Sequence, residues 1–293
     1  MRGVSEEHST TMKFRPTMKL SFSTLGCPAW SYQDILRRAA EYGFDGIAIR
    51  GLNGELDLVK VAEFRPTRRA ETRRQAERAG LAINLLGTST RLMVPDGELA
   101  VSQQNAKQHI DLAADLHCPF VRVFGGAIPV GLSHVVAIRR AAERLRELGD
   151  HAAARGVKVL IETHDDWVVP AFLRRALEAA NHPNIGALWD IHHPYRIAGV
   201  SIDDAWDALG PWIAAIDVKD SREDFTARLG YRYVKIGEGE IPLPDALALV
   251  RRNGYDGWLT FEWEKRWHPD LAEPDVVFPH FVKSIGDLLA SLK

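Results

Sequence analysis

Short apolar runs alternate with amphipathic stretches along almost the whole chain. Eight of the runs have the composition of buried strands, and each is followed by apolar residues at helical spacing. We expect strands at residues 20–25, 45–50, 81–86, 120–124, 157–162, 185–190, 213–218 and 258–262. We expect helices at residues 33–42, 67–79, 99–116, 133–154, 170–181, 202–209, 245–252 and 275–293. This alternation predicts a parallel sheet, because each helix returns the chain to the starting edge of the next strand.

Glycines mark the joints between helices and strands. The segments EYGFDG, ERAGLA, AARGVK and RNGYDG each place a Gly after a helical stretch and before a strand, a common way to end a helix. Eight such units in 293 residues fit one closed barrel. The alternative, an open doubly wound sheet, is disfavoured because no GxGxxG follows the first strand and no GxxxxGK occurs. We predict an α/β protein, a single-domain (β/α)8 TIM barrel over residues 20–293, after a flexible tail at residues 1–19.

The composition favours a small-molecule partner. The formal net charge is −2, so the chain lacks the basic field that attracts nucleic acids. Cys27 and Cys118 lack CxxC spacing, which excludes a disulfide framework or a thiolate zinc site. No apolar stretch approaches a membrane span of about 20 residues, and the first 19 residues lack the apolar core of a signal peptide. We therefore predict a cytoplasmic protein with no membrane or nucleic-acid partner; homo-oligomerisation stays open.

Four acidic residues lie at the ends of four consecutive predicted strands. Glu162, Asp190, Asp217 and Glu262 close the segments VKVLIE, IGALWD, WIAAID and GWLTFE. Strand ends of a barrel meet at one face, and a buried charge there needs a partner. Residues two positions apart share a face of a strand, and the positions two before these acids are Leu160, Leu188, Ala215 and Thr260. Four inward oxygen donors predict a hard divalent cation, Mn²⁺ or Mg²⁺ first, with Zn²⁺ or Co²⁺ as alternatives.

A simpler interpretation is that each acid caps the helix that follows its strand. Capping, however, does not require all four side chains to face inward. The shared inward position therefore favours the metal site over four independent caps.

At these residues the chain resembles a known family. IETH at Glu162, WDIHH at Asp190, VKD after Asp217, and GYDGWLTFEWE around Glu262 are similar to the sugar phosphate isomerase/epimerase family of xylose-isomerase-like TIM barrels. The resemblance extends from LSFSTLGCPAW to EWEKRWHP. Members bind a divalent metal through Glu, Asp, His and Glu of strands five to eight, which implies ligand roles for Glu162, Asp190 and Glu262. The third position differs: Asp217 stands where the family has His, which disfavours zinc.

The resemblance also implies an activity. It implies a divalent-metal-dependent isomerase or epimerase of a sugar, keto-sugar or cyclitol, acting by proton transfer through a metal-stabilised enediolate. In the epimerases that this chain resembles, the first and last ligand glutamates move the proton, so Glu162 and Glu262 are implied as catalytic residues. His193 falls where ketose epimerases of the family place a histidine that contacts the substrate.

Four further residues are candidates for substrate contacts or their support. Trp30 could stack on a sugar ring, and Arg122 could pair with an oxyanion. Lys219 could hold a substrate anion, and His164 could contact the substrate or orient a ligand. The alternatives are core packing for Trp30, an ion pair with Asp217 or another ligand for Lys219, and a structural role for His164. Arg50 also ends a strand, but neutralising an acid of the rim is its simplest role, and we leave it out of the site.

Three other functional classes remain open from the sequence. An inosose-dehydratase-like lyase would expel a β-hydroxyl from the same enolate. An endonuclease-IV-like phosphodiesterase shares the fold but is disfavoured by the lack of a basic surface and of histidines at metal positions. A non-catalytic sugar-binding relic would explain why Asp217 breaks the family pattern. The absence of GxxxxGK favours an unphosphorylated substrate.

Overall fold

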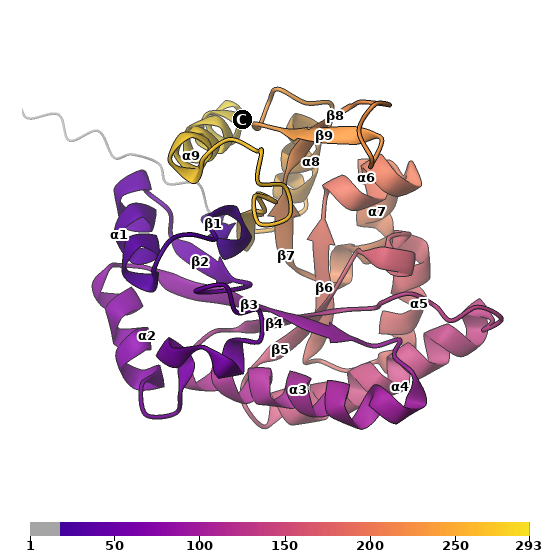
Figure 1. The fold of residues 1–293 in the computed structure, drawn as a ribbon. Coiled ribbons are helices and arrows are strands. Elements are labelled where there is room, and N and C mark those ends of the chain that lie inside the picture. Colours follow the sequence, from indigo (N-terminus) through magenta and orange to yellow (C-terminus); the bar gives the residue numbers. More distant parts are fainter. Residues whose placement is uncertain (1–17, 293) are drawn as a thin grey trace, which may run out of the picture.

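The computed structural model describes residues 18–292, which form a closed eight-stranded barrel (Figure 1). Every neighbouring pair of barrel strands is parallel, and the barrel closes between the first and the last strand. The strands are β1 (Lys19–Ser23), β2 (Gly46–Ile49), β3 (Ala82–Arg91), β4 (Phe120–Phe124), β5 (Lys158–Glu162), β6 (Ile185–Asp190), β7 (Ile213–Val218) and β10 (Trp258–Phe261). The predicted (β/α)8 barrel and its single domain are confirmed.

Helices surround the barrel (Figure 1). They are α1 (Tyr32–Tyr42), α2 (Arg69–Arg78), α3 (Asp96–Asp115), α4 (His134–Ala153), α5 (Pro170–Ala180), α6 (His192–Ala198), α7 (Ile202–Leu209), α8 (Leu243–Arg252) and α9 (Pro274–Ser291). Single 3₁₀ turns lie at Thr24–Gly26, Leu58–Lys60, Ala62–Phe64, Asp165–Trp167 and Gly210–Trp212. All eight expected helices are present, whereas the short helix α6 was not predicted. No helix within residues 18–292 has both the length and the apolarity to cross a membrane.

The predicted glycine joints are present. Gly43 ends α1 with φ of 84°, and its N–H donates to the carbonyls of Ala39 and Ala40. Because this left-handed conformation strains residues with a Cβ, glycine is the residue that fits. At the other end of α1, Ser31 accepts a hydrogen bond from the N–H of Asp34, so both ends of the helix are encoded locally.

An antiparallel hairpin that the sequence analysis did not predict follows β7. It consists of β8 (Asp220–Glu223) and β9 (Tyr231–Val234). The Asp220 carboxylate fixes the segment after it, since its oxygens accept N–H groups of Ser221, Gly237, Gly239 and Ile241 at 2.9–3.2 Å. A Cβ at Gly239 would lie 1.9 Å from Asp220 Oδ1, so this close approach requires glycine. The hairpin lies beside α6 (Figure 1), where Tyr231 contacts the ring of His192.

Two apolar clusters form the core. The larger lies between barrel and helices and includes the stacked rings of Phe261 and Phe281. The smaller fills the barrel interior with Ala48, Leu85, Leu160, Leu188 and Ala215. This interior layer supports the next inward positions, two residues further along each strand.

The predicted N-terminal tail falls mostly outside the described residues. Residues 1–17 are not described, and nothing tests their predicted flexibility. Lys19, which the prediction placed in the tail, is the first residue of β1. Met18 is already buried, because it packs into the main core cluster.

Candidate metal and catalytic site

The strand register brings the four predicted acids to one end of the barrel. Glu162 and Asp190 are the last residues of β5 and β6, Asp217 lies in β7, and Glu262 directly follows β10. Asp190 pairs in register with Asp217, and Asp217 pairs with Thr260. Carboxylate oxygens of the four acids lie within 4.8 Å of one another. The structure therefore assembles the four carboxylates that the sequence placed at four separate strand ends.

The donor set fits a hard divalent cation. All four acids are buried. Glu162 Oε2 is ion-paired with Arg122 and Asp190 Oδ2 with Lys219, whereas no cation among the described residues lies within ion-pair distance of Asp217. Buried carboxylate oxygens require a compensating charge or donor. Oxygen ligands of this kind are preferred by Mg²⁺ and Mn²⁺.

Asp190 both caps the helix that follows it and belongs to the group of four acids. Its Oδ1 accepts the backbone N–H groups of His192 and His193 at 2.8 and 3.2 Å, at the start of α6. These bonds fix the carboxylate and leave Oδ2 within reach of the other acids. Capping by the side chain thus explains α6 and at the same time orients a candidate ligand.

Lys219 lies among the acids. It is fully buried, and its Nζ lies 2.8 Å from Asp190 Oδ2 and 2.9 Å from Glu264 Oε1, and also contacts Glu262 Oε2. Burial alone would lower the pKa of Lys219, but the three carboxylates outweigh it and hold the pKa well above 10.5. The structure shows the ion-pair alternative for Lys219, with Asp190 and Glu262 as partners rather than Asp217.

Glu264 is a site residue that the sequence analysis did not include. It lies two positions beyond Glu262 in FEWE, so strand parity gave a signal for it. Counting Glu264, five carboxylates surround two ion-paired cationic side chains, Lys219 and Arg122. The cluster therefore has more carboxyl groups than cationic partners, and a divalent cation would favour the ionised form of these groups.

Arg122 pairs with Glu162. Its Nε lies 3.0 Å from Glu162 Oε2, its Nη1 donates to the carbonyl of Thr88 at 2.7 Å, and the guanidinium covers the ring of Phe124. Burial raises the pKa of Glu162 to about 7 although Arg122 and His164 oppose the rise. Arg122 is thus fixed at the edge of the acid cluster, with one guanidinium edge on a candidate ligand.

The pKa values of Asp217 and Glu262 are shifted in opposite directions. Burial, reinforced by Glu262, Glu162 and Asp190, raises the pKa of Asp217 well above its usual value. Burial also favours a raised pKa for Glu262, but the Lys219 ammonium outweighs it and the pKa is lowered. The two predicted catalytic glutamates therefore lie in opposite electrostatic environments.

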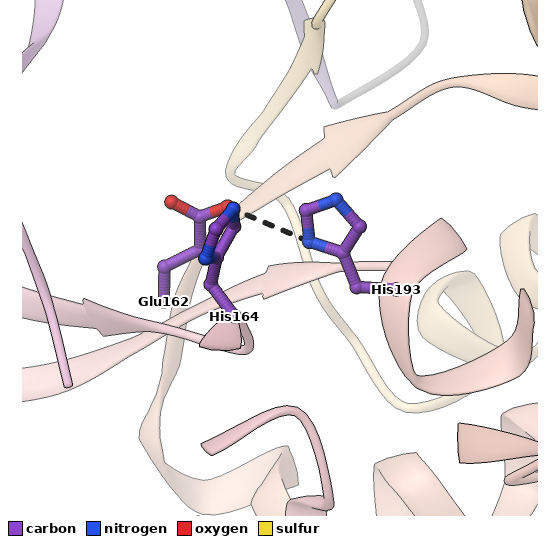
Figure 2. Close-up of side chains that lie close together, drawn as sticks. All are labelled: Glu162, His164 and His193. Carbon is purple, nitrogen blue, oxygen red and sulfur yellow. Dashed lines mark ion pairs between the residues drawn. The ribbon is translucent and has the colours of Figure 1, made fainter. Parts of the chain in front are cut away.

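Glu162, His164 and His193 lie together at the edge of the acid cluster (Figure 2). His193 Nδ1 lies 3.7 Å from Glu162 Oε1 and 3.1 Å from the carbonyl of Thr163. Its Nε2 lies 3.3 Å from Lys219 Nζ. An ammonium only donates, so Nε2 is the acceptor and the proton is on Nδ1, directed at Thr163. Burial and Lys219 hold the pKa of His193 well below 6.5, which makes it a neutral hydrogen-bonding group.

His164 and Trp30 contact other protein groups. His164 lies against the rings of Phe124 and His193, and its Nδ1 lies 2.9 Å from Asp165 Oδ1. Trp30 packs edge-on against Phe278, beneath the guanidinium of Arg38. The packing alternative for Trp30 is therefore what the structure shows, while its predicted contact with a sugar ring stays a prediction.

A cavity of about 660 Å³ lies between the hairpin and the segment after β10. Its walls include Tyr233, Trp263, Trp267 and His268. The ring of Tyr233 is 5.9 Å from Lys219 Nζ, so the cavity borders the acid cluster. It provides room for a ligand beside the candidate site.

Glu162→Gln is expected to make the stability of the metal-free protein less dependent on pH between pH 4.5 and pH 8. Folding raises the pKa of Glu162 from 4.5 to about 7, so the folded state binds this proton more tightly, and stability is lost as pH rises between those values. Removing the carboxyl group should abolish this pH dependence, while the loss of its ion pair leaves Arg122 without a counter-anion at both pH values. Urea unfolding at pH 8 and pH 4.5 measures this difference. Glu98→Gln, at an exposed position, is the control, and an equal effect of both changes would contradict the prediction.

Comparison with known proteins agrees with this architecture. Residues 36–278 match the family model of the xylose isomerase-like TIM barrel. The 2-oxo-tetronate isomerase of Pectobacterium atrosepticum is 27% identical over 181 residues, and the match covers 56% of this chain and 63% of that protein. The match thus spans less than two thirds of this relative.

Solved structures show the same fold at low sequence identity. The IOLI protein with a binding zinc atom superposes with a TM-score of 0.79 at 17% identity, covering 94% of this chain and 99% of that one. The D-allulose 3-epimerase from Methylomonas sp. gives a TM-score of 0.74 at 17% identity, with 94% and 100% covered. Since the family model extends from α1 to α9, the chain belongs to the xylose isomerase-like TIM barrel family.

Proposed function

We propose that the protein is a divalent-metal-dependent isomerase or epimerase of a sugar, keto-sugar or cyclitol. The observation that carries the proposal is the set of four buried carboxylates within 4.8 Å at the barrel mouth, because active sites of such barrels lie at this face. The isomerase name of the curated relative and the zinc in the IOLI structure support the class of reaction and the use of a metal.

Glu162, Asp190, Asp217 and Glu262 would hold the cation. When bound, it would act as a Lewis acid that stabilises negative charge on a substrate oxygen. We propose Mn²⁺ or Mg²⁺ rather than Zn²⁺ or Co²⁺, because all four donors are carboxylates and Asp217 replaces the histidine of the family pattern.

Glu162 and Glu262 would move a proton between the two faces of a substrate. Glu162 ends β5 and Glu262 directly follows β10. These two strands are separated in the barrel by β6 and β7, so the two carboxyl groups flank the site. One would remove the proton from the carbon next to the carbonyl, and the other would return it to the opposite face. Such a two-group transfer suits epimerisation, whereas one group suffices for isomerisation.

Lys219 and His193 would stabilise this arrangement. The Lys219 ammonium fixes the Glu262 carboxylate and lies 3.3 Å from His193 Nε2. Both side chains are buried and form hydrogen bonds within the protein, which restricts their rotamers. They would therefore hold the proton-transferring carboxylate and the substrate oxygens in fixed positions.

Incubation in D₂O tests the proposal. The Mn²⁺-loaded protein is mixed with a panel of ketoses, oxo acids and inososes, and products are analysed by NMR. We expect an isomer that carries deuterium at the carbon next to the carbonyl. Loss of water would instead assign the lyase alternative, and the absence of both exchange and product would contradict catalysis of this class. The Glu98→Gln variant should behave as the wild type, because its side chain is exposed on α3.

A further inference from the structure

The layer of side chains above the apolar barrel interior carries basic residues on one side and acidic residues on the other. Ala48, Leu85, Leu160, Leu188 and Ala215 form the apolar layer. Two residues further along the same strands come Arg50, Gly87, Glu162, Asp190 and Asp217. Arg122 follows Phe120, which packs on the same apolar layer. The side of β2 and β4 is therefore cationic, and the side of β5, β6, β7 and β10 is anionic.

Gly87 allows the two arginines to lie side by side. It belongs to β3, between β2 and β4, and pairs in register with Arg122. A Cβ at this glycine would lie 2.7 Å from Arg50 Cδ and 3.1 Å from Arg122 Nη2. Both arginine side chains thus lie against the same stretch of bare backbone, where a larger residue would separate them.

The two arginines are neutralised unequally. Arg122 has Glu162 as its partner. Arg50 is 7% exposed and donates from Nη2 to Ser89 Oγ at 3.0 Å, but its Nη1 is buried without a hydrogen-bond partner. Among residues 18–292 no carboxylate lies within ion-pair distance of its guanidinium.

A buried guanidinium beside a second cation is unfavourable without a counter-anion. Burial and the neighbouring Arg122 lower the pKa of Arg50 to about 9, although the more distant Glu262 and Glu162 oppose the fall. Because no carboxylate among the described residues lies within ion-pair distance of Arg50, a direct partner for its guanidinium would come from a ligand.

We propose that Arg50 and Arg122 form a subsite for a substrate carboxylate, so that the site acts on a sugar acid or oxo acid rather than on a neutral sugar. This inference rests on the proposed function. Arg122 uses Nε and Nη1 within the protein, which leaves its Nη2 for a ligand. Across Gly87, which both side chains contact, Nη1 of Arg50 is also unpaired. Two N–H donors match the two oxygens of a carboxylate. With the carboxylate held on the cationic side, the adjoining carbons face the acids.

Binding of two inert four-carbon probes tests the subsite. Threonate carries a carboxylate and threitol does not, and neither has an aldehyde or ketone group on which the enzyme could act. In calorimetric titrations of Mn²⁺-loaded protein, we expect threonate to bind at least about 10-fold more tightly than threitol. Arg50→Met should weaken threonate binding roughly 10- to 100-fold and leave threitol unchanged. Arg174→Met, which removes a half-exposed arginine on α5, should change neither affinity.

Further measurements separate a binding role from a structural one. Because Arg50 has no ion-pair partner, Arg50→Met should not lower the melting temperature of the ligand-free protein, and Arg50→Lys should give intermediate threonate affinity. A lowered melting temperature with unchanged threonate affinity would overturn the subsite. Arg50-dependent binding of inorganic phosphate that is tighter than that of threonate would also overturn it.

The outcomes distinguish this inference from the proposed function. One outcome would overturn the subsite alone. In that outcome the protein exchanges the α-proton of a neutral ketose with solvent, and its threonate affinity does not depend on Arg50. Threonate binding that depends on Arg50, with no exchange in any substrate of the panel, would support the subsite and overturn the proposed isomerase or epimerase activity.

Discussion

Glu262→Gln is expected to lower turnover by about 10²-fold or more while the metal stays bound. Glutamine keeps the size of the side chain and one oxygen donor, but it removes the group that accepts a proton. Metal affinity should fall only moderately, since Glu162, Asp190 and Asp217 remain. The variant is loaded with saturating Mn²⁺, occupancy is confirmed by elemental analysis, and exchange of the substrate α-proton with solvent is measured.

Glu264→Gln is the matched control for this change. Glu264 also pairs with Lys219 but is outside the group of four candidate ligands, so its loss should reduce turnover much less. Near-wild-type exchange in fully loaded Glu262→Gln would leave Glu262 a ligand only. A parallel loss of exchange in Glu162→Gln would favour a two-carboxylate epimerase over a single-base isomerase.

The barrel could be predicted because its strands are encoded by local composition. The segments at residues 120–124, 185–190 and 213–218 match β4, β6 and β7 residue for residue. Strands covered on both faces are nearly continuous apolar runs, and such runs end where polar residues begin. The inward position of the four acids could also be predicted, because residues two positions apart share one face of a strand.

The elements that were not predicted depend on contacts between separate segments. Helix α6 begins where the carboxylate of Asp190 accepts two backbone N–H groups, and at seven residues it is too short for a clear helical period. The β8–β9 hairpin is held by Asp220, whose partners Gly237, Gly239 and Ile241 lie 17–21 residues further along the chain. Neither arrangement leaves a periodic signal in the sequence.

The pairing of charges could not be predicted for a related reason. Arg50 was not among the predicted site residues, because an arginine at a strand end is expected to neutralise an acid of the rim. In the structure Arg122 makes such a pair, with Glu162, and Arg50 Nη1 has no partner. Strand parity predicts which side chains face inward, but the rotamers that decide their pairing depend on the whole layer.

Removing divalent cations is expected to abolish activity, and this is the largest effect that we expect. The proposed proton transfer needs the cation to stabilise negative charge on a substrate oxygen. Activity is measured after EDTA treatment and after adding back Mn²⁺, Mg²⁺, Zn²⁺ or Co²⁺ singly. We expect Mn²⁺ to restore activity better than Zn²⁺, because carboxylate donors favour hard ions.

Asp217→His supplies the internal comparison for metal choice. It restores the histidine of the family pattern at a buried position of β7 and replaces one carboxylate by a nitrogen donor. The variant should shift its preference toward Zn²⁺ or Co²⁺ and keep activity, because nitrogen donors suit these ions. Full activity of the wild type in chelator, with metal content confirmed to be negligible, would refute metal dependence. An unchanged metal preference in Asp217→His would instead remove Asp217 from the ligand set and leave a three-carboxylate site of Glu162, Asp190 and Glu262.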